Sequence, residues 1–319
     1  NLEIDNTKDI TTILNGIGQV YQALGDSQHA MEYFNLALDY SGDANNSLLL
    51  SNIYGNLGEQ YTLSGNYPEA LQYYEKALEI TLLEEHRAAE GGLLNNIGRV
   101  LLRQEKYSEA YEYLEKSLII SQEIGSKPTE CMATNNIGMV FFNTGNYVEA
   151  ETYFQLSLKL SQEMNDRDYE ITSLYNIAST SVVLENIPVA IDYLINAVEI
   201  VESIQNEMKP EELVSSYSDS HVWIYEVLIK HLWDQGRTKE AFNYIERAKA
   251  RAFLNQIGQE KISLADNGTQ ELLIEAEEIQ KEISETREQL YEIYYQPTNN
   301  WDNDLVQNLK LNINQLEQK

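Results

Sequence analysis

Residues 131–170 read CMATNNIGMVFFNTGNYVEAETYFQLSLKLSQEMNDRDYE, a forty-residue segment with a clear helical pattern. Apolar residues recur every three or four positions, which predicts one helix over residues 133–143 and a second from 147 to about 162. The Thr-Gly-Asn segment at 144–146 is typical of a turn, because Gly and Asn tolerate the left-handed backbone that ends a helix. The stretch therefore predicts a helical hairpin.

The same pattern recurs along the chain with a period of 40 residues. Small residues mark three positions of each unit, where two packed helices need room to approach each other, and bulky residues beside them fill the remaining space. The three rows are Gly18, Gly58, Gly98, Gly138 and Ala178; Ala30, Ala70, Ala110, Ala150 and Ala190; and Ala37, Ala77, Ser117, Ser157 and Ala197. Such a period predicts hairpins stacked into a solenoid.

This order of Gly, aromatic, Ala, aromatic and Ala resembles the tetratricopeptide-repeat (TPR) family over about residues 11 to 200, with a unit longer than the common one. The resemblance implies an all-α, right-handed superhelix of about six helical hairpins followed by a C-terminal helical hairpin. We expect a solenoid over residues 8–258, with repeats near 11–50, 51–90, 91–130, 131–170, 171–210 and 215–258. The polar segments between repeats, such as 125–128 and 165–168, are predicted to be loops.

Beyond residue 205 the period loosens. A sixth hairpin is predicted from residues 225–233 and 239–257. A heptad pattern over residues 272–293, ended by Pro297, predicts a helical hairpin or linker at 268–319. Because the chain stops within a helical pattern, we expect it to be a piece of a longer protein.

The segment YIERAKARAFL at residues 244–254 resembles the end of the repeat array in bacterial proteins that join TPRs to a caspase-like CHAT protease domain. The resemblance implies that this chain is the regulatory or sensing arm of such a protease. It also implies an intramolecular contact with that domain. The sensory arm of a histidine kinase or transcriptional regulator is the alternative.

Composition limits the partners and the chemistry. Lys and Arg total 22 against 51 Asp and Glu, and a formal net charge of −29 argues against nucleic acid and anionic membranes. A single cysteine, Cys131, favours a cytoplasmic location over a disulfide framework. The chain has no catalytic triad pattern, phosphate loop or metal-binding motif, so we expect neither enzymatic activity nor a cofactor or metal.

In TPR arrays the first helix of each hairpin lines a concave groove, and offsets from the glycine row place side chains in it. The groove is expected to bind a peptide or a partner domain, with amides that hydrogen-bond to peptide backbone. The predicted binding residues are Asn15, Gln19, Glu59, Thr62, Asn95, Arg99, Leu102, Arg103, Asn135, Met139, Phe142 and Tyr175.

Two features of this groove have alternative interpretations. Asn56, Asn96, Asn136 and Asn176 form a second row that either binds ligand or joins neighbouring hairpins. Arg99 and Arg103 either meet an acidic ligand or pair with an acid such as Glu59. The first repeat has Asn15 and Gln19 where carboxylate-clamp TPRs place Lys and Asn, which argues against chaperone tails as ligands.

Overall fold

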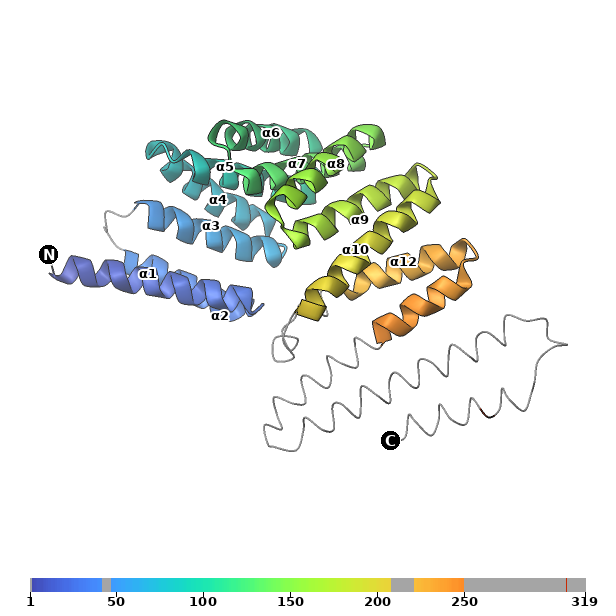
Figure 1. Ribbon diagram of the computed structural model, residues 1–319. Coiled ribbons are helices and arrows are strands. Elements are labelled where there is room, and N and C mark those ends of the chain that lie inside the picture. Colours follow the sequence, from blue (N-terminus) through green and yellow to red (C-terminus); the bar gives the residue numbers. More distant parts are fainter. Residues whose placement is uncertain (1, 42–46, 208–220, 250–307, 309–319) are drawn as a thin grey trace. The chain divides into compact units, whose positions relative to one another are not determined.

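The computed structural model describes residues 2–41, 47–207 and 221–249, together with residue 308 (Figure 1). These residues form helices joined by turns and contain no strand, which confirms the predicted all-α fold class. The chain divides into two compact units, residues 1–200 and 201–319, and each is described by itself.

The described part of the first unit is a series of hairpins that follow one another along the chain (Figure 1). The helix pairs are α1 (Leu2–Ala23) with α2 (Ser27–Ser41), α3 (Ser47–Leu63) with α4 (Tyr67–Leu83), α5 (Arg87–Arg103) with α6 (Tyr107–Ile124), α7 (Lys127–Asn143) with α8 (Tyr147–Met164), and α9 (Arg167–Val183) with α10 (Ile187–Glu207), which extends into the second unit.

The glycine row has a defined packing role inside each hairpin. A Cβ atom built on Gly98 would lie 2.5 Å from Leu114 Cγ, and one on Gly138 would lie 2.6 Å from the Phe154 ring. Leu114 and Phe154 are fully buried. The row thus makes room for a large side chain of the second helix, in addition to letting the two backbones approach, and that buried side chain contributes roughly 2–3 kcal/mol.

The first helices form the inner layer of this unit. Successive first helices contact each other from α1 through α9, whereas successive second helices among the described residues make no comparable contacts. Helices that touch their counterparts in the next repeat lie on the inside of a curved stack. The residues that the glycine-row offsets predicted for the groove all belong to these first helices.

Two helices begin earlier than the sequence predicted. The segments around 125–128 and 165–168 were expected to be loops, but α7 begins at Lys127 and α9 begins at Arg167. Pro128 lies in the first turn of α7, where a missing backbone N–H leaves no hydrogen bond unmade. As a result Cys131 lies inside α7 and is fully buried.

In the second unit, α12 (Val222–Asp234) is followed by helical residues 238–249. Arg247 donates to both carboxylate oxygens of Glu202, at 2.9 and 2.5 Å, and its guanidinium lies 4.5 Å from the centre of the Tyr244 ring. Tyr225 donates to the same carboxylate at 2.8 Å. The predicted helical segment at 250–257 lies outside the described residues, as does the hairpin at 268–319 except for residue 308.

Candidate functional site

Asparagine side chains join successive first helices in the inner layer. Asn136 Nδ2 donates to Asn95 Oδ1 at 2.9 Å, between α7 and α5. The same Asn–Asn bond, which we call a rung, recurs two repeats earlier in the pair Asn56 with Asn15, at 2.9 Å, and one repeat later in the pair Asn176 with Asn135, at 2.7 Å. The second asparagine row therefore bonds between neighbouring hairpins, and its acceptors are three of the amides that were predicted to bind ligand.

One rung of this ladder is missing, between α3 and α5. Asn96 is the donor of that repeat, but Gly55 occupies the position at which its acceptor would stand. Asn96 is half-buried and its side chain makes no hydrogen bond within the described residues. A Cβ on Gly55 would meet only Leu93 Cδ2, at an ordinary 3.7 Å. Packing therefore does not require a glycine here, in contrast to Gly98.

Beside the missing rung, an ion pair joins the same two helices. The Arg99 guanidinium is bonded to Glu59, and Tyr74 Oη donates to the same carboxylate at 2.8 Å. Burial alone would lower the pKa of Arg99, but the charge of Glu59 and its hydrogen bond outweigh burial and raise that pKa. Burial, reinforced by Glu59, also raises the pKa of Tyr74. The pairing alternative considered for Arg99 is the one observed.

The other predicted groove residues differ in accessibility. Arg103 and Gln19 are exposed, and Arg103 makes no side-chain hydrogen bond or ion pair within the described residues. Thr62 donates to the Gly58 carbonyl at 2.8 Å, and its hydroxyl lies 3.5 Å from that of Tyr74. Half-buried residues complete the set: Leu102, Met139, Phe142 and Tyr175. Phe142 contacts the Tyr147 ring edge-on at 5.4 Å.

Sequence reasoning missed two polar features of this site. Tyr74, four residues after Ala70, is one of the bulky residues that were expected only to fill space beside the small rows. Its bond to Glu59 joins residues 15 apart, a separation that is unrelated to the 40-residue period. Gln60 is buried, and neither of its amide atoms finds a partner among the described residues. The signal for Gln60 was available, because Val100 and Val140 occupy the same position in later repeats.

The described residues carry no cluster of His, Cys, Asp and Glu that could hold a metal ion. Burial raises the pKa of the Cys131 thiol, whose Sγ lies 3.4 Å from Ser157 Oγ. In this part of the chain, none of the helices has both the length and the apolarity needed to cross a bilayer.

Comparison with known proteins agrees with this repeated geometry. Two sequence profiles, both described as the tetratricopeptide repeat, match the chain: one at residues 49–123, 90–163 and 128–203, the other at 11–43. Together they span more than half of the sequence. The chain is a tetratricopeptide-repeat protein. No curated protein sequence matches it.

Solved structures show the same fold as this TPR chain. The crystal structure of apo RapI has a TM-score of 0.55 at 14% identity, covering 77% of this chain and 98% of RapI. BtubC from P. vanneervenii has a TM-score of 0.54 at 18% identity, with 72% and 90% covered. Aspartyl phosphate phosphatase F from Bacillus subtilis has a TM-score of 0.55 at 15% identity, with 78% and 60% covered. Such low identities show the fold alone, and a TPR fold indicates a protein-interaction scaffold.

Proposed function

We propose that this protein binds an extended peptide segment of a partner in the concave groove, centred on the interrupted rung between α3 and α5. The observation that carries the proposal is the pair of Gly55 and Asn96. A glycine in the middle of a helix costs about 1 kcal/mol relative to alanine, and no close packing at Gly55 explains it. Its effect is to leave the Asn96 amide without its usual partner.

A peptide backbone has the groups needed to replace the missing asparagine. The Asn96 side chain offers both N–H donors and a carbonyl acceptor, so it can bond to the C=O and N–H of an extended segment. Gly92 lies one turn before Asn96 on α5, and no atom lies within 4 Å of a Cβ built there. Because Gly55 and Gly92 carry no side chains, they leave room for the backbone of a ligand to approach Asn96.

The charge beside this position favours an acidic residue in the ligand. Residues 96, 99 and 103 are spaced three and four apart and share one face of α5. Arg99 is engaged with Glu59, whereas Arg103 is exposed and unpaired within the described residues. A ligand carboxylate near Arg103 would form a charge-assisted hydrogen bond. Leu102, Met139 and Phe142 supply half-buried apolar surface nearby.

We keep regulation of an attached CHAT-type protease in the cytoplasm as part of this proposal. It rests on the resemblance at residues 244–254, of which the structure describes 244–249. Arg247 bonds that segment to Glu202, and its guanidinium also lies over the Tyr244 ring, as expected for a helix that closes a repeat array. An intramolecular contact with the protease domain is part of the same proposal.

Peptide display against the whole chain tests the groove. Peptides selected from a random library are expected to contain an acidic residue and to bind several-fold more weakly to Asn96→Ala, which removes hydrogen bonds worth about 0.5–1.5 kcal/mol each. Arg103→Ala should weaken them about tenfold or more, since bonds to charged groups are worth about 1.5–3 kcal/mol. Gly55→Asn restores the rung and should also weaken binding.

Lys159→Ala is the matched control, because Lys159 is exposed on the second helix α8. It should leave the affinity unchanged. Selected peptides that bind equally to all the groove variants would show that recognition lies elsewhere and would remove this proposal.

A further inference from the structure

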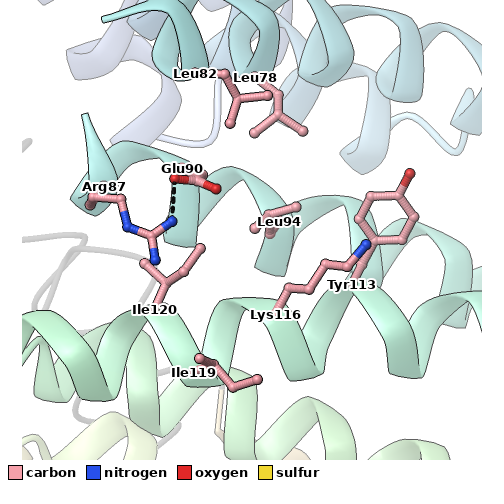
Figure 2. A pocket seen from close by; sticks show the side chains of 9 residues that line it. All are labelled: Leu78, Leu82, Arg87, Glu90, Leu94, Tyr113, Lys116, Ile119 and Ile120. Carbon is pink, nitrogen blue, oxygen red and sulfur yellow. Dashed lines mark hydrogen bonds and ion pairs between the residues drawn. The ribbon is translucent and has the colours of Figure 1, made fainter. Parts of the chain in front are cut away.

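A pocket of about 450 Å³ opens on the opposite side of α5 from the asparagine ladder. Figure 2 shows α4 and α6 as its two walls, with side chains of α5 between them. Leu94 of α5 lines the pocket, and Asn96, two residues later, points roughly 200° away around the helix. The pocket is therefore separate from the groove of the proposed function.

At the junction beside this pocket, one side chain differs from the corresponding residue of the next repeats. Gln122 Nε2 of α6 donates to Glu130 at 3.1 Å, and Gln162 of α8 donates to Glu170 at 2.9 Å, so a Gln–Glu bond bridges each of these junctions. The corresponding residue of α4 is Leu82, which cannot donate. Glu90, the corresponding acid, is bonded to Arg87 instead (Figure 2).

The lips of the pocket are apolar and accessible. Leu82 is 54% exposed and Ile119 is 50% exposed. One repeat later, the same positions hold the polar residues Gln122 and Lys159. Solvent exposure alone therefore does not explain why residues 82 and 119 are apolar. Paired apolar side chains at the edge of a concave site are a feature of surfaces that bind other molecules.

The charges at the rim are not equivalent. Arg87 is ion-paired with both Glu90 and Glu123, so its charge is satisfied within the chain. Lys116 Nζ lies 5.6 Å from the centre of the Tyr113 ring and pairs with no carboxylate among the described residues. The pocket thus combines an apolar interior with one cation that is free to meet an anionic group.

We propose that this pocket docks one face of an amphipathic helix from a partner protein, with two apolar side chains one turn apart entering it and a carboxylate beside them meeting Lys116. A groove between two helices with apolar lips suits the helix-in-groove mode, which reads residues three and four apart. Because Leu82 and Ile119 at the rim are exposed, a bound segment would remain partly in solvent, as the outward-facing side of a docked helix does. The net charge of −29 repels a strongly acidic segment, so the docked helix carries few other acids.

Two hydrocarbon-stapled helical peptides test this site on the full chain. Both carry leucines at positions i and i+4, and they differ in one flanking residue, Glu in the first and Lys in the second. In fluorescence anisotropy the Glu peptide should bind about tenfold or more tightly than the Lys peptide, as for one charge-assisted contact. Lys116→Glu should reverse that order. The double variant Leu82→Gln, Ile119→Lys should bind neither peptide.

The controls come from the chain itself. The double variant places at two exposed positions the residue types found one repeat later, at 122 and 159. Its melting temperature should therefore match that of the parent chain. Lys159→Glu makes the same charge change at an exposed position on α8, away from the pocket, and should leave both affinities unchanged. Equal affinity for the two peptides would overturn the proposal. So would loss of binding in Lys159→Glu, or binding of octanoate at this pocket while neither helix binds.

Discussion

The junction between the second and third hairpins differs from the one between the third and fourth on both faces. In the later junction, Asn136 bonds to Asn95 on the inner side and Gln122 bonds to Glu130 on the other side. In the earlier junction, Gly55 removes the first of these bonds and Leu82 removes the second. The two junctions involve corresponding helices of successive repeats, forty residues apart in the sequence.

This comparison shows that a repeat scaffold can be opened at one place without altering the hairpins beside it. The earlier junction keeps a buried core that includes Tyr74, Ile97 and Leu101, and it keeps the ion pair of Glu59 with Arg99. What it loses are polar bonds at its two surfaces. Because each repeat contacts mainly its neighbours, such a loss remains local.

The largest expected effect comes from breaking a hairpin rather than a junction. Gly98→Val should lower the free energy of unfolding by about 3 kcal/mol, because its Cβ alone would approach Leu114 Cγ to 2.5 Å. Gly55→Ala should raise it by about 0.4–1 kcal/mol, since that position has room for a side chain. Urea melts of both variants measure the contrast. Equal destabilisation would contradict the distinction between the two glycines.

Removing the donor of a complete rung should have the next largest effect. Asn136→Ala leaves the buried Asn95 carbonyl unpaired and should cost about 1–3 kcal/mol. Asn96→Ala removes a side chain that has no hydrogen-bond partner among the described residues and should change stability by less than about 0.5 kcal/mol. Thermal melts of the two variants test the pair. A cost for Asn96→Ala as large as that for Asn136→Ala would mean that the rung is not interrupted.

Completing the interrupted rung should produce a smaller gain. Gly55→Asn supplies an acceptor for Asn96 and should stabilise the chain by about 1 kcal/mol, the usual net worth of a hydrogen bond. Hydrogen exchange should then slow at the inner side of α3 and α5, which the new bond joins. Unchanged exchange and an unchanged melting temperature would show that the two positions do not face each other.

The smallest effect is expected on the opposite side of the same junction. Leu82→Gln recreates the amide that bonds to the acid of the following helix in later repeats, and an exposed bond of this kind contributes about 0.5 kcal/mol. Gln122→Leu is the reciprocal variant and should lose a similar amount. A double-mutant cycle with Glu130→Gln would attribute that loss to the Gln–Glu bond, and additive effects would rule the bond out.

The repeat itself was predictable because packing inside a hairpin imposes local rules. A glycine facing a large buried side chain leaves a strict sequence signal, and Gly18, Gly58, Gly98 and Gly138 all report the same contact. Helix starts were less predictable, since the polar residues and Pro128 around the start of α7 are equally suited to a loop and to a first helical turn.

For the candidate site, the sequence placed the asparagine rows in the inner layer and left their roles open. Asn15 could bond to Asn56 or to a ligand, depending on the distance between two helices that are forty residues apart in the sequence. The amino-acid sequence does not give that distance. The same holds for Arg99 with Glu59 and for Tyr74. Each of these bonds depends on how the helices pack in space.

The helical hairpin, its period and its buried rows can be predicted from the amino-acid sequence, because they follow from residue spacing within about forty positions. Which polar groups already have a hydrogen-bond partner, and which are open to a ligand, depends on the three-dimensional packing. Hydrogen bonds require donor and acceptor within about 3 Å, and that proximity is set by how neighbouring hairpins stack. Gly55 and Leu82 matter because neither can form the bond that its counterpart forms in other repeats, the Asn–Asn rung for Gly55 and the Gln–Glu bond for Leu82.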